Sequence, residues 1–420
     1  MSRRKLAYGT LIAVADQAWL SALNFLIGIA FIRYAPKEDY AVYLQLFAVL
    51  LLGMSIQAAL YLGPLLTLAP KRDAAGEATL VHHLGFLQGC SAAFVALLSI
   101  PALLATGSVL NLPLLGLNAA LLFAIWMYAA WKREYRRELG FLAQRPDRTA
   151  MLDGAFGLVL LLALAWLASQ GSLSLITTLG MLAVANLISL LMPQQDSGPA
   201  QPDLSAEARR QAIRDAWPLA RWALPGVLVT WVYTHSYLYI SAAMLGTQAT
   251  ADLGAARLLL MPVGILLIGW GNVFLPRVSR QLGNQESARG IRAAMLAAVA
   301  TTPVTLLFLG LLWLCFPLIQ TYLLGEQYSD LHGLIIVWAA YFCLRGFSLN
   351  AAILLQAAGE FRRMFQYSFI GMLVGLTAVV AGAHWFGAAG CVAGLAVTEL
   401  AVALLIWWRG VPAIYKASAA

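Results

Sequence analysis

The sequence predicts an all-α membrane protein with about twelve transmembrane helices. Of its 420 residues, 61% are hydrophobic and only 11% are charged. A soluble domain is about 45–50% apolar and about 25% charged, so a soluble core would not hide this much apolar surface. Apolar stretches of roughly 20 residues recur along the chain, and each is long enough to cross a bilayer. They leave no segment long enough for a sizeable soluble domain.

The predicted spans follow from hydropathy read in windows of about 20 residues. They cover residues 7–33, 40–69, 79–105, 111–131, 149–169, 173–192, 212–245, 250–276, 288–316, 331–357, 364–385 and 387–408. The first span carries Asp16 and has a longer apolar run than the roughly 7–15 residues of a cleaved signal peptide. We therefore expect it to stay in the mature protein.

Most of the 27 Lys and Arg residues lie in alternate loops. If the N-terminus is cytoplasmic, the cytoplasmic segments hold nearly all of them, and Lys37 is the one clear case on the opposite side. The positive-inside rule therefore predicts a multi-pass protein of the bacterial inner membrane with both termini cytoplasmic. The net charge of +8 then reflects topology and attraction to anionic membrane lipids, and it does not indicate a nucleic-acid partner.

Two cytoplasmic loops are longer than the rest, residues 132–148 and 193–211. The second is rich in Pro, Gln, Ser and Ala, which predicts a linker over 194–211 between an N-terminal lobe, 1–193, and a C-terminal lobe, 212–420. The two halves also echo one another at an offset of about 212 residues. A six-plus-six repeat around a central cavity is a recurring plan of membrane transporters.

Motifs of the common enzyme classes are missing from the sequence. It contains no GxxxxGK[ST] loop for ATP and no serine, histidine and acid at a recognisable catalytic spacing. The four cysteines fall inside predicted spans and form no CxxC or Cys/His cluster. We therefore expect a protein that is not an enzyme and needs neither a cofactor nor a metal.

Four arginines within or at the end of predicted spans are not explained by topology. They are Arg33, Arg221, Arg257 and Arg345. An arginine at mid-bilayer costs about 2.5–3.5 kcal/mol on insertion scales, so such residues usually face a water-filled cavity or pair with an acid. Asp16 and Glu399 are available as partners, but two acids cannot neutralise four arginines. Arg33, near the outer end of its span, either faces the cavity or snorkels to the interface.

Polar residues at helical spacing accompany these charges and predict the cavity lining. They are Gln17 and Asn24 on the first span, and Trp338, Tyr341 and Gln356 on the tenth. Asp16 is either a carboxylate for a coupling ion or an arginine partner, and Glu399 is better explained by pairing between helices. A cationic cavity favours an anionic ligand, and the planar guanidinium suits phosphate or pyrophosphate.

Two segments resemble parts of the polysaccharide flippases. Residues 34–46 are similar to the outer turn and second-helix start of that family, with Ala41 where its pattern has glycine. Residues 251–280 are similar to its eighth span, although Ala256 lies near the usual tyrosine. The family pattern is retained at Gly254, Arg257, Pro276 and Ser279.

Residues 355–364 and 386–405 look like the closing spans of the same family. The chain thus resembles the Wzx-like branch of the multidrug/oligosaccharidyl-lipid/polysaccharide (MOP) exporter superfamily. The resemblance implies a MATE-like fold of two six-helix lobes around a central cavity. It also implies movement of an undecaprenyl-pyrophosphate-linked oligosaccharide to the outer leaflet, with polysaccharide polymerase and export proteins as partners.

The resemblance makes Arg257 the basic residue of the eighth-span motif, with Arg221 and Arg345 as its companions. Two alternatives remain open. The first is a multidrug antiporter on the same fold, which would need an acid-rich cavity. The second is a non-transporting membrane subunit of a polysaccharide synthase.

Overall fold

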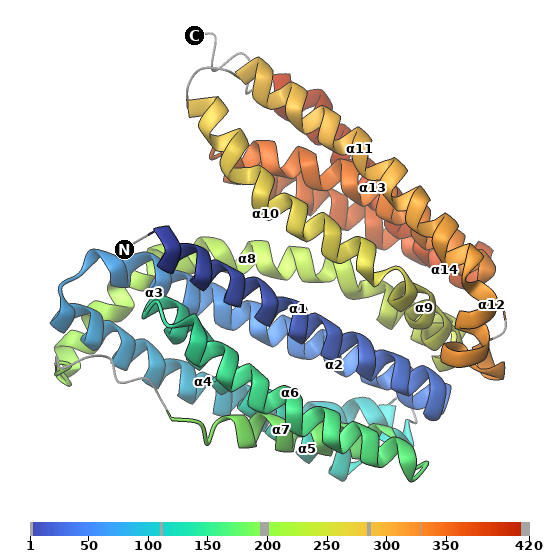
Figure 1. Cartoon of the computed structure of the whole chain (residues 1–420), viewed down its shortest axis with the longest axis horizontal. Helices are drawn as coiled ribbons and strands as arrows, with labels where there is room; N and C mark the ends of the chain where they lie inside the picture. The colour runs from blue at the N-terminus through green and yellow to red at the C-terminus, as the bar shows by residue number, and fades with distance from the viewer. Residues whose placement is uncertain (1–2, 110–111, 194–200, 284–286, 329, 413–420) are drawn as a thin grey trace. The chain divides into compact units, whose positions relative to one another are not determined.

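The computed structural model describes residues 3–109, 112–193, 201–283, 287–328 and 330–412, and all regular structure within them is helical (Figure 1). Each predicted span coincides with a helix or a helical segment, so the all-α prediction is confirmed. The chain forms two compact units, Met1–Leu228 and Val229–Ala420. The boundary between them falls inside α8 (Ala206–Leu245). The lobe boundary predicted over 194–211 is thus not where the compact units divide.

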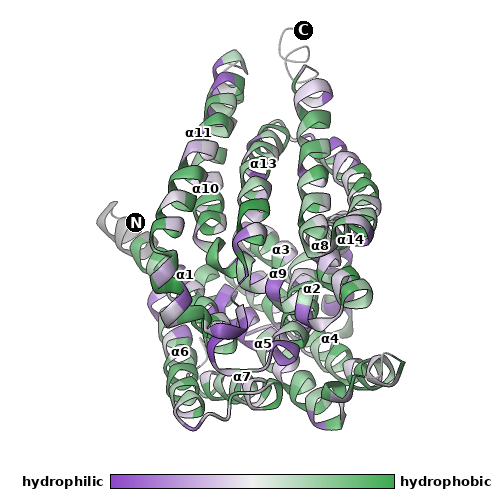
Figure 2. Ribbon diagram, turned by 90° about the vertical axis from the view of Figure 1, so that its right-hand side faces the viewer, coloured by the Kyte–Doolittle hydropathy of each residue, from purple (hydrophilic) through white to green (hydrophobic). Residues whose placement is uncertain are grey.

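Among the described residues, seven helical stretches are long and apolar enough to cross a membrane. An eighth is α9 (Thr247–Leu259) taken with the start of α10 (Met261–Gly283), which bend by 54° at their junction. The chain is therefore a multi-pass membrane protein. Figure 2 shows the matching pattern, in which hydrophobic residues cover most of every long helix.

The first unit is a helical bundle that runs into the first half of α8. Its helices are α1 (Arg3–Tyr34), α2 (Lys37–Gln57), α3 (Gly63–Leu68), α4 (Ala74–Val109), α5 (Leu117–Leu142), α6 (Pro146–Ser169) and α7 (Leu175–Ser189). The central helix is α5, which packs against α2, α4, α6 and α7. Its residue Trp131 is almost fully buried, and the backbone carbonyl of Trp131 accepts hydrogen bonds from the amides of Gln57 and Gln88 at 2.8 and 3.2 Å.

Two predicted cytoplasmic loops are more helical than expected. The loop predicted over 132–148 is mostly the end of α5, which continues to Leu142 because ion pairs satisfy its buried arginine, Arg137. Of the predicted linker, residues 194–200 lie outside the described residues, 201–205 are not helical, and the rest belongs to α8. The backbone N–H of Asp203 donates to Thr79 of α4 at 2.9 Å. The backbone N–H of Ser205 donates to the Asp203 carboxylate and lowers the pKa of that group.

The second unit continues from α8 and contains the α9–α10 pair. Its further helices are α11 (Ser287–Leu314), α12 (Phe316–Ile319), α13 (His332–Ala357) and α14 (Phe361–Leu405). The central helix is α13, which packs against α9, α10, α11 and α14. The indole N–H of Trp338 on α13 donates to the backbone carbonyl of Leu253 at 3.1 Å and ties α13 to α9.

The long helix α14 is interrupted at Gly387, where φ is +61° and ψ is −141°. Glycine adopts this backbone conformation at no steric cost, so the chain turns here between the two predicted spans 364–385 and 387–408. Across the turn the helices pack backbone to backbone, because a Cβ added at Gly382 would lie 2.2 Å from the carbonyl oxygen of Gly390. Small residues of this kind permit close packing of membrane helices.

Candidate functional site

An ion pair joins α13, the central helix of the second unit, to α14. The Nη1 of Arg345, on α13, contacts the Oε1 of Glu399, on α14, at 2.8 Å, and Ser348 donates to the other carboxylate oxygen. The side chain of Glu399 is 1% exposed, whereas that of Arg345 is 32% exposed. The same Nη1 donates to the hydroxyl of Tyr233 at 3.4 Å, so Glu399 and Tyr233 share one nitrogen of the guanidinium. Within the described residues, the other two guanidinium nitrogens have no hydrogen-bond partner.

A second arginine lies on the neighbouring helix α9. The Nη1 of Arg257 donates to the hydroxyl of Tyr237 at 2.9 Å, and its guanidinium carbon lies 5.7 and 5.6 Å from the ring centres of Tyr237 and Trp338. Tyr341 meets the Trp338 ring edge to face at 5.2 Å. A cation held over aromatic faces gains about 0.5–2 kcal/mol, so these rings fix the position of the guanidinium.

An aromatic face of α8 belongs to the same unit. Trp231 stacks on His235 with 5.8 Å between ring centres and meets Tyr239 at a tilted angle with 5.6 Å between ring centres, and all three side chains are partly exposed. These residues recur at i, i+4 and i+8, which places them on one side of the helix. The second unit thus combines two arginines, one buried acid and a set of aromatic side chains.

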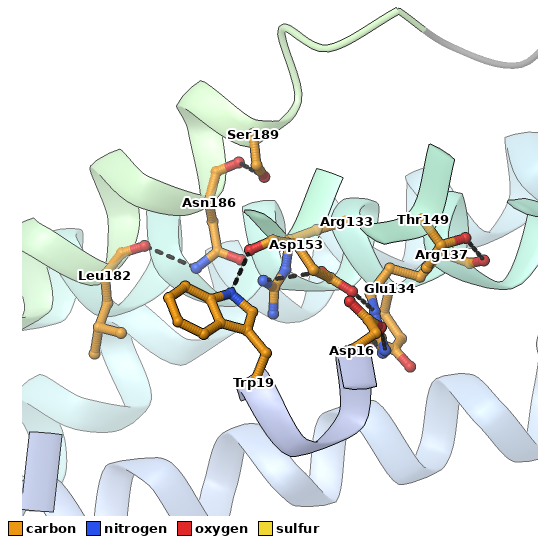
Figure 3. A network of polar contacts seen from close by, with 10 residues as sticks. All are labelled: Asp16, Trp19, Arg133, Glu134, Arg137, Thr149, Asp153, Leu182, Asn186 and Ser189. Atoms are coloured by element: carbon orange, nitrogen blue, oxygen red, sulfur yellow. Dashed lines mark hydrogen bonds and ion pairs between the residues drawn. The ribbon is translucent and has the colours of Figure 1, made fainter. Parts of the chain in front are cut away.

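The first unit contains a different cluster around Arg137 of α5 (Figure 3). The guanidinium contacts Asp153 of α6 at 2.5 Å, Glu134 of its own helix at 2.9 Å and Asp16 of α1 at 3.3 Å. Arg133 lies 3.4 Å from Asp153 and stacks on a phenylalanine ring of α6 at 3.7 Å. The Asp16 and Asp153 side chains are 3% and 0% exposed and that of Arg137 is 10% exposed, so the network is mostly buried.

The predicted site residues fall into two groups. Arg257, Trp338, Tyr341, Arg345 and Glu399 come together in the second unit. Asp16 is an arginine partner, but its partner is Arg137, a residue that the sequence placed in a cytoplasmic loop. The other predicted residues, Arg33, Arg221, Gln17, Asn24 and Gln356, all have exposed side chains.

Each of the four predicted arginines has a different local environment. Glu399 neutralises Arg345, and Asp252 is half-buried on α9 five residues before Arg257. Arg221 lies against the ring of Trp222 at 5.6 Å, and Arg33 lies in the last turn of α1, a position from which an arginine can snorkel to the interface.

Sequence reasoning missed Arg137, Asp153, Tyr233 and Tyr237. Arg137 was hidden among six basic residues that topology alone explained. Asp153 lies near the start of a predicted span and carried a usable signal, because an acid within an apolar segment usually has a partner. The tyrosines carried no signal that separates them from interfacial aromatics.

Comparison with known proteins bears on this fold. No family model matches the sequence, and no curated protein matches it. A multidrug resistance MATE family transporter of the MOP superfamily, solved in an inward-facing conformation, superposes with a TM-score of 0.78 at 13% identity over 94% of this chain and 95% of that chain. The fold is that of MOP-superfamily transporters.

Two further structures share this fold. A MATE transporter of Vibrio cholerae, solved as a mutant, has a TM-score of 0.65 and 14% identity over 99% of this chain and 96% of that chain. A MOP superfamily transporter from Pyrococcus furiosus has a TM-score of 0.60 and 13% identity over 99% and 94%. The latter is described as having a binding pocket of reverse polarity, which suggests a different function for it. Proteins that share this fold can therefore have binding pockets of different polarity.

Proposed function

We propose that this chain is a flippase of the Wzx-like type. It moves an undecaprenyl-pyrophosphate-linked oligosaccharide from the cytoplasmic to the outer leaflet of the bacterial inner membrane by alternating access, and both of its termini are cytoplasmic. In this proposal it serves the synthesis of a cell-surface polysaccharide and works with the polymerase and export proteins that use its product. One observation carries the proposal. The guanidinium of Arg345 is partly exposed while it pairs with the buried carboxylate of Glu399, and Arg257 lies on the adjacent helix.

Arg345 suits a phosphate for two reasons. The ion pair with Glu399 fixes the position of the guanidinium, and it leaves other N–H donors of the guanidinium to bind the phosphate. The buried carboxylate fixes one edge of the guanidinium, and the planar fork presents the other N–H groups in the geometry that phosphate oxygens accept. Glu399 also offsets the cost of keeping the arginine in a membrane segment when no ligand is bound. The arginine is thereby positioned before the ligand arrives.

Arg257 supplies the second cation and does so beside aromatic rings. Pyrophosphate carries charge on two phosphorus centres, and two arginines on neighbouring helices match that distribution. The partly exposed rings of Trp231 and Tyr239 offer apolar faces on which the rings of a sugar pack. In this proposal the polyprenyl tail stays in the surrounding lipid.

The fold neighbours make a multidrug antiporter the second candidate. It would bind organic cations and needs a carboxylate that faces them. In the described structure, however, Asp16, Asp153 and Glu399 are all buried and engaged by arginines. This arrangement disfavours cation export and favours an anionic substrate.

The test is to delete the gene and identify by mass spectrometry the lipid-linked species that accumulates. We expect an undecaprenyl-pyrophosphate-linked oligosaccharide on the cytoplasmic face, and expect its level to return to normal when the wild-type gene is restored. Normal polysaccharide export in the deletion strain, together with sensitivity to organic cations, would instead support the antiporter.

A further inference from the structure

A groove on the second unit lies between α10 and α11. These helices pack side by side (Figure 1). The groove has a volume of about 250 Å³ and is lined on α10 by large side chains that include Leu266 and Trp270. On α11 it is lined by smaller ones, Ala300, Thr301 and Val304 among them. The small side chains of α11 leave room beside the large side chains of α10, and this space forms the groove.

The floor of the groove is apolar even where it contains threonines. Thr301 and Thr305 are 8% and 1% exposed, and their hydroxyls donate to carbonyls of their own helix at 2.7 and 2.9 Å. Since the hydroxyls are satisfied within α11, no polar group of these threonines is offered to a ligand in the groove. On the far side, Thr301 packs against Gly346 of α13, so the floor is closed.

A basic cluster stands at one end of the groove. Arg277 and Arg280 lie at the end of α10 and Arg289 and Arg292 at the start of α11, and all four side chains are exposed. The two helix ends are adjacent, because a Cβ on Gly290 would lie 3.7 Å from the side chain of Gln281. In the sequence, Glu286 is the one acid between residues 272 and 292, and it lies outside the described residues.

The spacing between groove and charges fits one leaflet. Trp270 precedes Arg277 by seven residues, about 10 Å of helix, and Val263 precedes it by fourteen, about 21 Å. One leaflet is about 20–22 Å thick with its headgroup region, of which about 15 Å is hydrocarbon. The groove is apolar at the depth of the acyl chains, Trp270 lines it at the end nearer the arginines, and the arginines lie at headgroup level. This order of apolar and basic groups matches the acyl chains and phosphate of an anionic phospholipid.

We infer that the α10–α11 groove binds an anionic diacyl phospholipid of the cytoplasmic leaflet. One acyl chain lies between Leu266 and Val304, and the phosphate lies among Arg277, Arg280 and Arg292. Neither Arg257 nor Arg345 lines the groove, and the inference does not depend on which substrate the protein carries. The groove lies within one leaflet's depth of the arginines, which fits a diacyl lipid of that leaflet.

The experiment uses the purified full chain in nanodiscs of phosphatidylcholine that contain a small fraction of phosphatidylglycerol. Native mass spectrometry counts the phosphatidylglycerol molecules that stay bound. Each basic residue near an anionic surface contributes about fivefold in affinity, so the triple variant R277Q/R280Q/R292Q should bind about 100-fold more weakly. The matched control is R209Q/R210Q/R214Q, which removes three exposed arginines at the start of α8, in the first unit, and should bind as the wild type does.

A second variant tests the groove itself. Ala300→Phe places a ring in the groove from an exposed position, and Ala340→Phe is its control on an exposed position of α13. We expect Ala300→Phe to displace the lipid and Ala340→Phe to retain it; Ala300→Leu replaces Ala300→Phe if the latter unfolds in detergent. Retention of the lipid by both the arginine triple variant and the Ala300 variant overturns the inference. So does loss in the arginine variant alone, which would indicate headgroup attraction without a groove, or displacement of phosphatidylglycerol by equimolar undecaprenyl phosphate.

Discussion

The central helices α5 and α13 hold equivalent places in the two halves, but they carry opposite kinds of polar cluster. They are the fourth and the tenth predicted spans, so a six-plus-six repeat relates them, and each packs against four other helices of its own unit. On α5, Arg137 contacts three carboxylates and is about one tenth exposed. On α13, Arg345 has one carboxylate partner and stays about one third exposed.

The difference between these clusters separates structure from function. A guanidinium surrounded by acids has no room for a ligand, and its main effect is to hold α1, α5 and α6 together. A guanidinium with one buried acid keeps donors for an outside anion while the acid fixes its position. The helices α5 and α13 thus occupy corresponding positions in the fold. Whether the arginine on each can bind an anion depends on how many carboxylates contact it and on its exposure to solvent.

The largest effect should come from the closed cluster. Arg137→Ala leaves Asp16 and Asp153 buried without their main partner, which costs about 3–5 kcal/mol when a buried pair is broken. Thermal unfolding in detergent should show a large loss of stability. Arg145→Ala removes an exposed, solvent-screened pair with Asp147 and should melt close to the wild type. Equal melting of the two variants would contradict the assignment of α5 as the structural cluster.

The open cluster should separate stability from transport. Arg345→Gln leaves Glu399 without its charged partner and should cost about 1.5–3 kcal/mol, less than at Arg137 because water reaches Arg345. The double variant R345Q/E399Q removes both charges and should recover most of that stability. It should still fail to flip substrate, because the donors for the phosphate are gone. A double variant that melts and transports as the wild type does would show that the pair is only structural.

Arg257 should matter for transport more than for folding. Arg257→Gln removes the hydrogen bond to Tyr237 and the contact with two rings, worth about 0.5–2 kcal/mol together. Substrate flipping should fall at least about tenfold, since a charge-assisted bond to phosphate contributes about 1.5–3 kcal/mol. Arg257→Lys keeps the charge but not the fork, and we expect an intermediate rate. A wild-type flipping rate in Arg257→Gln would rule this residue out of the site.

The smallest effects should come from the exposed arginines of the first unit. Arg221→Gln and Arg33→Gln alter side chains at the surface of α8 and α1, so stability should change by no more than about 0.5 kcal/mol. Transport in proteoliposomes should stay close to the wild-type rate. If Arg221→Gln lost as much transport as Arg257→Gln, Arg221 would belong to the substrate site, as the sequence predicted. The site would then not be confined to the second unit.

The helices were predictable because the bilayer imposes one strong constraint. Apolar length determines a span, and the break at Gly387 agreed with the boundary expected between the last two spans. The end of α5 was not predictable in this way. Arg137 looked like a cytoplasmic residue until Asp16 and Asp153, distant in the sequence, were found beside it.

The site was predictable only in part, for the same reason. Arg257, Trp338, Tyr341, Arg345 and Glu399 were chosen for being polar or aromatic within apolar segments, and the structure brings them together. Which acid pairs with which arginine depends on contacts between helices, which helical periodicity does not encode.

The most direct measurement of the central claim is flipping by the purified chain alone. Proteoliposomes would contain an undecaprenyl-pyrophosphate-linked oligosaccharide, and the fraction that becomes accessible to a glycosidase on the opposite face would be followed over time. The account predicts flipping by the wild type and by Arg221→Gln, with a loss of at least about tenfold in R345Q/E399Q and in Arg257→Gln. An unchanged rate in both of these variants would contradict the claim that the two arginines of the second unit hold the phosphate.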